Sequence, residues 1–392
     1  MPADFQRLRV LLLNDNLRGV GSFYRCWHLA QELVRLGHEV CLVTVSRTRR
    51  ILPRSERSDS LKLIESPNLL DLVYGLGPGY GIVGLPYRML AVARDRFDIV
   101  HAFESRLNVL LPAVLSRALN GCPLVVDWAD WWGFTRDGSG LQERRPWPVP
   151  YLETALEEFI HRKADWVTTI STGLRDRALA LGIPADRVRL IPSGAAAEAI
   201  RPLDIISCRR ELDIPPATYL IGYVGSQVGD LEILSPALRV LRKSHPQVKL
   251  GIIGPPPSDV RAPGFRDAVI PFGPVQFPQL PLYLGACDSF VLPLRDTVFN
   301  RTRWPNKFGD YLAAGRPILC SDVGDVAGIV QAEGCGVVWS SLSDLVQGVE
   351  SLVEDKPAAD SMGRASRRVA EGRLSWRGIT LEFLKLYHDA AS

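Results

Sequence analysis

The sequence predicts an α/β protein made of two Rossmann-like, doubly wound parallel-sheet domains. Two observations lead to this prediction. Apolar runs of strand length alternate with amphipathic helical segments along nearly the whole chain, and the alternation stops once, near the middle, before it starts again. With 392 residues, the chain is also too long for one ordinary core and long enough for two.

The first half begins with a strand, a helix and a second strand. Apolar residues predict a strand at 9–14, apolar residues at helical spacing predict a helix at 24–36, and EVCLVTV predicts a strand at 39–45. Such a unit implies a parallel sheet with a right-handed crossover. The other strands of this half are expected at 61–65, 99–102, 124–127, 166–170 and 188–191, with a prominent helix at 151–163.

Residues 195–216 separate the two halves, because they are rich in Ala and Pro and have little strand character. We therefore expect one domain over 1–197 and a second over 198–375. The strands of the second domain are expected at 219–224, 248–253, 268–272, 289–292, 317–320 and 336–339. Two such sheets facing across a cleft bind ligands at the carboxyl ends of their strands.

Composition and charge narrow the functional classes. Hydrophobic residues make up 46% and charged residues 23%, which is typical of a globular protein. Lys and Arg number 46 against 43 Asp and Glu, and the formal charge of +3 is too small for a general nucleic-acid binder. Seven scattered cysteines, without a CxxC pair or a nearby histidine, indicate reduced intracellular thiols and predict no metal site.

A glycine pair follows the first strand, in the segment NDNLRGVGSFYR at 14–25. Gly19 and Gly21 let backbone N–H groups approach a phosphate at the start of a helix, although the same pair also suits a plain tight turn. The complete GxGxxG pattern is absent because Tyr24 takes the place of the third glycine. The arginines of SRTRR at 46–50 suit a 2′-phosphate, so an NADP-dependent enzyme stays an alternative.

Two further groups of polar and aromatic residues follow strands of the first domain. His101 is expected at the end of its strand, facing the cleft, as a binding or proton-transferring group; the alternative is a buried histidine. The segment LVVDWADWWG at 124–133 places Asp127 and Asp130 beside three tryptophans. These tryptophans, which suit either stacking on a sugar or packing in the core, are Trp128, Trp131 and Trp132.

The most informative segment of the second domain is NRTRWPNKFGDYLAAGRP at 300–317. A loop with Arg301, Arg303 and Lys307 leads into a helix that begins near Asn306, so side-chain cations and a helix N-terminus predict an anion site. Asp310, one turn into the helix, is either an acceptor for ribose or sugar hydroxyls or a carboxylate that favours the helix dipole.

On these motifs the chain resembles the GT-B glycosyltransferases, most closely family 4. Asp310 and the following AAGRP are similar to the family's carboxylate helix and A-x-G-x-P ending. The other matching motifs, in chain order, are LLNDN with its glycine turn and LGHEV, DIVHA, ADWVTTIST with LGIPADRVRLIPSG, LPLRDT and MGRASRRVAEGRLSW. The resemblance implies a helix at 376–392 that packs back on the first domain.

The resemblance also implies an activity of EC class 2.4 and roles for the candidate residues. A nucleotide-diphosphate sugar would bind mainly to the second domain, an acceptor hydroxyl mainly to the first, and the anomeric configuration would be retained without a metal. Lys307 with Arg301 or Arg303 would hold the diphosphate, and Gly19 and Gly21 its distal phosphate. The remaining donor contacts would be Asp310 with the ribose, Asn306 at the helix start, and Gly225 and Gln227 with a phosphate or base.

The catalytic expectations fall on His101, Asp130, Arg303 and Lys307, and the acceptor expectations on the three tryptophans. Some family positions are changed, however. Thr302 stands where a first glutamate is usual, Asp310 shortens the second, and Ala129 replaces a histidine that contacts the transferred sugar. The expected arginine and lysine are also absent from GSQVGD at 225–230. A non-catalytic protein that binds a nucleotide sugar or a glycan is therefore the alternative function.

The expected setting is the cytoplasm, in the synthesis of a surface polysaccharide, a glycolipid or a natural-product glycan. The N-terminus has no signal-peptide pattern, and the longest apolar stretch, 69–92, is interrupted by glycines and prolines, so no membrane-spanning helix is predicted. This stretch, with Arg88, Arg94 and Arg96, is expected to rest on the inner membrane face if the acceptor is lipid-linked.

Overall fold

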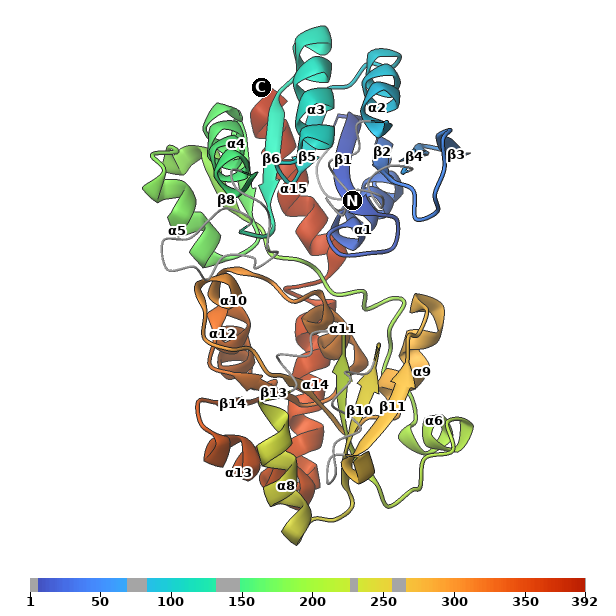
Figure 1. Cartoon of the computed structure of the whole chain (residues 1–392), viewed down its shortest axis with the longest axis vertical. Coiled ribbons are helices and arrows are strands. Elements are labelled where there is room, and N and C mark those ends of the chain that lie inside the picture. The colour runs from blue at the N-terminus through green and yellow to red at the C-terminus, as the bar shows by residue number, and fades with distance from the viewer. Residues whose placement is uncertain (1–5, 69–82, 132–148, 226–231, 256–265, 392) are drawn as a thin grey trace. The chain divides into compact units, whose positions relative to one another are not determined.

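The computed structural model describes residues 6–68, 83–131, 149–225, 232–255 and 266–391. The chain divides into two compact units (Figure 1). The first unit contains Met1–Ser193 together with Trp376–Ser392, and the second contains Gly194–Ser375. Each unit is built around its own largely parallel sheet, so the predicted α/β class with two doubly wound sheets is confirmed.

The first unit has an eight-stranded sheet in the order β3-β4-β2-β1-β5-β6-β7-β8. All neighbouring strands are parallel except β3 and β4, which form an antiparallel hairpin at the edge. The strands are β1 (Arg9–Leu17), β2 (Glu39–Val45), β3 (Arg54–Ser58), β4 (Leu61–Ser66), β5 (Ile99–Phe103), β6 (Leu124–Trp128), β7 (Trp166–Thr169) and β8 (Val188–Leu190). The charged strand β3 is not predicted, because RSERS lacks the apolar character of a buried strand.

Six α-helices accompany this sheet in the part of the unit that the structure describes. They are α1 (Phe23–Arg35), α2 (Gly84–Ala93), α3 (Leu107–Asn120), α4 (Val149–Lys163), α5 (Thr172–Ala180) and α15 (Trp376–Ala391), and a 3-10 turn spans Ala185–Arg187. Helix α1 buries Cys26, Leu29 and Leu33, which recur at helical spacing. The C-terminal helix α15 packs against α1, where the Trp376 and His28 rings stack with centroids 5.2 Å apart.

The second unit has a six-stranded parallel sheet in the order β11-β10-β9-β12-β13-β14. The strands are β9 (Tyr219–Val224), β10 (Val248–Ile253), β11 (Val269–Gly273), β12 (Ser289–Leu292), β13 (Ile318–Ser321) and β14 (Gly336–Trp339). The helices are α6 (Ile205–Glu211), α8 (Leu234–Ser244), α9 (Leu280–Gly285), α10 (Val298–Thr302), α11 (Asn306–Ala314), α12 (Gly324–Glu333), α13 (Leu342–Glu354) and α14 (Lys356–Glu371), with 3-10 turns at Arg266–Ala268 and Phe277–Gln279.

The core of the second unit fixes α11, the helix of the predicted anion site. Tyr311 of α11 stacks on Phe290 of β12 with ring centroids 4.3 Å apart, and its hydroxyl accepts a hydrogen bond from the Val224 backbone N–H at 2.8 Å. Gly315 ends the helix in the left-handed conformation, at a φ of 69°. The helix is therefore held against β9 and β12 by buried contacts.

Candidate functional site

The turn between β1 and α1 has the form that the glycine pair predicts. Gly19 and Gly21 have φ angles of 80° and 56°, in the region that favours glycine. A β-carbon at Gly21 would lie 3.2 Å from the side-chain oxygen of Asn16. Asn16 is itself held in place, because its amide donates to Ser22 Oγ at 2.8 Å. The first turn of α1 contains no acidic residue, so an anion would meet no carboxylate there.

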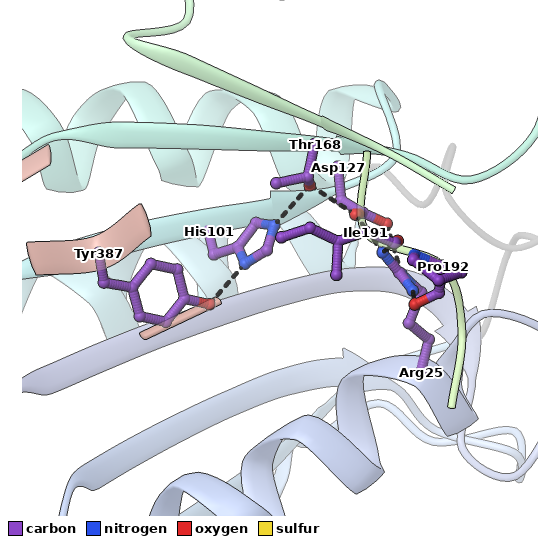
Figure 2. Close-up of polar contacts among 7 residues, drawn as sticks. All are labelled: Arg25, His101, Asp127, Thr168, Ile191, Pro192 and Tyr387. Carbon is purple, nitrogen blue, oxygen red and sulfur yellow. Dashed lines mark hydrogen bonds and ion pairs between the residues drawn. The ribbon is translucent and has the colours of Figure 1, made fainter. Parts of the chain in front are cut away.

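A buried ion pair lies at the carboxyl end of β6 (Figure 2). Arg25 of α1 donates through Nε and Nη2 to the two carboxylate oxygens of Asp127, at 2.9 and 2.8 Å. The same guanidinium donates to the backbone carbonyls of Ile191 and Pro192 at 2.8 and 2.9 Å. Thr168 Oγ1 also donates to Asp127 at 2.6 Å. The Arg25–Asp127 pair therefore joins α1, β6, β7 and the segment after β8.

Sequence reasoning missed Arg25, although a signal for it exists. Arg25 stands among the buried residues of α1, next to Cys26, where an unpaired guanidinium would be costly. An arginine on the buried face of a helix predicts a buried partner. The sequence does not reveal which carboxylate provides it, because 102 residues separate Arg25 from Asp127.

The prediction that His101 stands at the end of its strand is wrong. His101 is the third residue of β5, is fully buried, and lies with Nδ1 2.7 Å from the Tyr387 hydroxyl of α15 (Figure 2). Burial lowers the pKa of His101 to about 3, so the ring is neutral at physiological pH. The strand continues to Phe103, which moves its carboxyl end beyond His101. The alternative of a buried, satisfied histidine describes this residue.

Two of the three tryptophans are packed within the first unit. The Trp128 indole is buried, donates to Glu157 Oε1 at 2.6 Å, and stacks on the His161 ring at 4.0 Å. The half-buried Trp131 lies under the Arg177 guanidinium, 3.6 Å from the ring centroid. The core alternative thus holds for Trp128, whose burial leaves no ring face for an acceptor. Trp132 lies outside the described residues.

The carboxyl ends of β1 and β5 bring acidic residues together. Glu104 follows β5 with a φ of 76°, which is strained for a residue other than glycine, and its side chain is buried. Asp15, in the neighbouring strand β1, is also buried, and desolvation raises its pKa to about 6. Arg106 forms an ion pair with Glu153 of α4, whose pKa burial raises to about 7. Sequence reasoning missed this cluster. The half-buried Asp130 follows β6 at the same edge of the sheet.

In the second unit, Lys307 lies in the first turn of α11 over the carboxyl end of β9. Its Nζ is 4.0 Å from the centroid of the Tyr223 ring. A β-carbon at Gly225, directly after β9, would approach that Nζ to 2.9 Å, and the φ of Gly225 is 137°. The first turn of α11 has no acidic residue, and Asn306 is exposed at its start. The Lys307 ammonium group, the N-terminus of α11 and the nearby backbone of Gly225 therefore lie together here.

Asp310 lies in the second turn of the same helix and is half-buried. Desolvation raises its pKa to about 7. The described residues provide neither a hydrogen bond nor an ion pair to this carboxylate. It therefore has acceptor capacity for the hydroxyls of a ligand that reaches it.

The three residues Arg301, Thr302 and Arg303, which precede α11, make different contacts. The exposed Arg301 forms an ion pair with Asp296, with Nη2 2.6 Å from Oδ2, which occupies its guanidinium. The guanidinium of Arg303 lies over the Phe299 ring, 5.3 Å from its centroid. Thr302 is buried, and its hydroxyl donates to the carbonyl oxygens of Val298 and Phe299. Gln227 lies outside the described residues.

Two tandem doubly wound sheets, each with a glycine and a helix N-terminus at the carboxyl ends of its strands, define a nucleotide-binding class of α/β protein. Residues 21–194 match the family model of a glycosyl transferase 4-like domain, and residues 218–355 match the model of glycosyl transferases group 1. The chain belongs to the group 1 glycosyltransferases, as the resemblance implied.

Individual relatives are distant. The D-inositol 3-phosphate glycosyltransferase of Stackebrandtia nassauensis is 23% identical over 263 residues, which cover 62% of this chain but only 58% of that protein. The sucrose-phosphate synthase of Thermosynechococcus elongatus superposes with a TM-score of 0.75 at 19% identity, covering 98% of this chain and all of the other. HepE of Anabaena, solved with UDP-glucose, gives 0.69 at 14% identity, with 98% and 100% coverage. These structural likenesses confirm the predicted GT-B fold class.

Proposed function

We propose that this protein is a retaining glycosyltransferase that moves a sugar from a nucleoside-diphosphate sugar to a hydroxyl acceptor. The observation that carries the proposal is the position of Lys307, beside Gly225 and at the N-terminus of α11. A diphosphate needs such a combination of a side-chain cation and backbone N–H groups. Because the relative HepE was solved with UDP-glucose, we propose a UDP-sugar as the first donor to test.

In the proposed reaction, Lys307 stabilises the negative charge that develops on the leaving diphosphate. This is electrostatic catalysis, in which preorganised charges act where the transition state becomes charged. Contact with the Tyr223 ring holds the ammonium group in place before the donor binds. Arg303 is a second cation for this role, whereas Arg301 would first have to leave Asp296. The Asp310 carboxylate would accept hydrogen bonds from the ribose hydroxyls.

The proton of the acceptor hydroxyl passes to a donor phosphate oxygen in this proposal, so no protein nucleophile is needed. No metal is assigned a role; among the described residues, no group of three or more His, Cys, Asp or Glu side chains is placed to hold one. The first unit would bind the acceptor near Asp130 and Glu104, where β6 and β5 end. Gly19 and Gly21 are the phosphate-contacting residues that we propose in the first unit.

The proposed acceptor is a carbohydrate or a lipid-linked glycan, in the synthesis of a surface polysaccharide, a glycolipid or a natural product. We place the protein in the cytoplasm, with a peripheral contact to the inner membrane face. No helix in the described parts of the chain is long and apolar enough to cross a bilayer.

A thermal-shift screen followed by a turnover assay tests the function. Saturating ligand raises apparent stability by mass action, so UDP-sugars should raise Tm more than GDP-, ADP- or TDP-sugars do. Release of UDP in the presence of glycan acceptors, with the product anomer determined by NMR, then tests the transfer and its retaining outcome. Product with the inverted anomeric configuration would contradict the retaining mechanism.

A non-catalytic protein that binds nucleotide sugars is the second candidate. Thr302 favours it, because its hydroxyl is already satisfied within α10 and cannot replace a carboxylate that binds the sugar. Tight binding of a nucleotide sugar without hydrolysis or transfer on any acceptor would establish this alternative. The hypothesis of an NADP-dependent enzyme is not retained, because glycosyltransferase family models match both halves of the chain.

A further inference from the structure

Residues 46–53 connect β2 to β3 and expose both arginines and aliphatic side chains; we call residues 47–54, which include Arg54 at the start of β3, the arginine loop. Ile51 and Leu52 are 63% and 65% exposed. Among the exposed large hydrophobic residues of the described chain, only Leu152, at 65%, is as exposed as these two. Four arginines flank this pair, at Arg47, Arg49, Arg50 and Arg54. All of them are exposed except Arg50, which is half-buried.

Three of these arginines have no ion-pair partner in the part of the chain that the structure describes. Arg54 forms an ion pair with Glu56, with Nη2 2.8 Å from Oε1. For Arg47, Arg49 and Arg50, the described residues provide no carboxylate within ion-pair distance. Within the described residues, the loop therefore presents three arginines without an ion-pair partner directly beside two water-exposed aliphatic side chains.

The base of the arginine loop is held in place by hydrogen bonds. The Asn68 backbone N–H donates to the Arg50 carbonyl at 3.2 Å, and its side-chain amide donates to the Ser46 carbonyl at 3.0 Å. The Ser46 N–H donates in turn to the Ser66 carbonyl at 3.0 Å. Ile51 and Leu52 therefore follow directly after a backbone segment that is hydrogen-bonded at Ser46 and at Arg50.

From this combination we infer that the arginine loop docks the first unit on an anionic membrane surface. Aliphatic side chains that enter the headgroup region and arginines that contact lipid phosphates are the two components of interfacial binding. A protein partner fits less well, because a stable interface buries roughly 800 Å² on each partner, far more than two aliphatic side chains provide.

The location of the loop links docking to the proposed substrate. The Arg18 N–H, at the start of the Gly19–Gly21 turn, donates to the carbonyl of Val45, the last residue of β2, at 2.9 Å. The arginine loop and the glycine turn therefore leave the same edge of the sheet. Docking there would bring a lipid-linked acceptor to that edge; this last step alone rests on the proposed function.

The loop replaces part of the membrane contact that the sequence predicts. In that prediction Arg88 belongs to the contacting stretch, but it is buried and donates to Ser66 Oγ, the Asn108 carbonyl and the Asn14 carbonyl. Arg88 is therefore unavailable to lipid. Residues 69–82 of that stretch lie outside the described residues.

A fluorophore placed on the loop tests the docking directly. All seven native cysteines are buried, so an Ile51→Cys variant can be labelled selectively with an environment-sensitive dye. Ile206→Cys, on α6 at 60% exposure, is the matched control. Vesicles of phosphatidylcholine with phosphatidylglycerol, added without nucleotide sugar, should increase the emission of the label at position 51 and leave that at 206 unchanged. Because no substrate is present, the result is independent of catalysis.

Charge removal provides the second arm of the test. Each arginine near an anionic surface contributes roughly a fivefold factor to binding, so Arg47→Gln/Arg49→Gln/Arg50→Gln should lower vesicle partitioning on the order of 100-fold at low salt. A control that replaces the exposed Arg210, Arg364 and Arg368 of the second unit should keep most of the binding. The inference is overturned if the wild type does not bind anionic vesicles or if the two triple variants bind them equally well. It is also overturned if the labelled Ile51→Cys variant binds vesicles without a change in emission.

Discussion

At the scale of single residues, Lys307 and Asp310 are the polar side chains of α11 on which the donor proposal depends. The two residues are separated by one helical turn, and their surroundings differ. Lys307 is positioned against the Tyr223 ring, whereas Asp310 is desolvated and has no partner among the described residues. A desolvated acid without a partner lowers stability in exchange for binding capacity, as functional sites commonly do. Asp310 therefore allows stability and binding to be measured separately.

Replacing Asp310 with Asn should raise stability and weaken donor binding. Burial raises the pKa of Asp310 from 3.8 to about 7, so the folded protein holds a proton that the unfolded chain releases between these pH values. Stability therefore falls as pH rises from about 4 to 7 and stays low above 7. At pH 8, Asp310→Asn should raise Tm by roughly 2–8 °C, as about 1–2 kcal/mol would, and flatten the pH dependence of Tm.

The same variant should weaken UDP-glucose binding by roughly 10-fold, because an amide is a poorer acceptor for ribose hydroxyls than a carboxylate. Asp325→Asn, at the start of α12, is the control for removal of one acid from a helix of the same unit. If Asp310→Asn raised Tm and left donor affinity unchanged, Asp310 would be a structural residue rather than a donor contact.

A second residue-scale prediction concerns Gly225. A β-carbon there would come within 2.9 Å of Lys307 Nζ, and the φ of 137° is unfavourable for alanine. Gly225→Ala should therefore displace the ammonium group and lower donor affinity by at least about fivefold, with a loss of stability of about 1 kcal/mol or more. Gly328→Ala is the matched control, because nothing lies within 4 Å of its β-carbon position. Equal donor affinities for the two variants would contradict the proposed diphosphate site at Lys307 and Gly225.

At the scale of secondary-structure elements, the Arg25–Asp127 pair connects parts of the first unit that are far apart in sequence. It joins α1 to β6, and it also holds the carbonyls of Ile191 and Pro192 near the end of the unit. Arg25 additionally lies over the Phe383 ring of α15, 5.2 Å from its centroid. One guanidinium of α1 thus contacts β6, α15 and the segment after β8.

Removing Arg25 should destabilise the first unit more than any surface change does. Arg25→Met leaves the buried Asp127 carboxylate uncompensated, which costs about 3–5 kcal/mol. The double variant Arg25→Met/Asp127→Asn should recover part of this loss, because no buried charge then remains. Urea unfolding of both variants and of a control at the exposed Arg187, Arg187→Met, measures the coupling. A loss below 1 kcal/mol for Arg25→Met would contradict the proposed coupling between Arg25 and Asp127.

The elements themselves were largely predictable from sequence, and the side-chain partners were not. Alternating apolar segments predicted the strands on both sides of residues 195–216, because parallel strands covered by helices are continuously apolar. The charged β3 was missed for the same reason, since an edge strand has no such run. The sequence predicts His101 near a strand end because the predicted strand stops at 102, one residue before β5 ends.

Side-chain roles depend on contacts that the sequence does not contain. Nothing local indicates that Trp128 packs on His161 or that Asp127 pairs with Arg25, because these partners lie on other elements. In contrast, Lys307, Asn306 and Asp310 belong to one local segment, so the sequence alone predicts that they lie on the same helix. The sequence shows the arginines of SRTRR, but not their exposure beside Ile51 and Leu52, which depends on the fold.

At the scale of the whole molecule, the two units should respond differently to the donor. Lys307, Asp310 and Gly225 all lie within Gly194–Ser375, whereas the Arg25–Asp127 network lies in the first unit. In differential scanning calorimetry, UDP-glucose at about 100 times its Kd should stabilise the transition of the second unit by about 2.7 kcal/mol. The destabilised Arg25→Met variant identifies the transition of the first unit. A donor shift confined to the first unit's transition would contradict the assignment.

The most direct test of the central claim is an isothermal titration of UDP-glucose into wild type, Lys307→Ala and Lys385→Ala. Lys307→Ala should weaken donor affinity by ~5–150-fold, as the loss of about 1–3 kcal/mol from a charged hydrogen-bond partner implies. Lys385→Ala, which removes an exposed lysine paired with Glu382 on α15, should bind like wild type. Unchanged affinity in Lys307→Ala would contradict the account, because the diphosphate would then lie elsewhere.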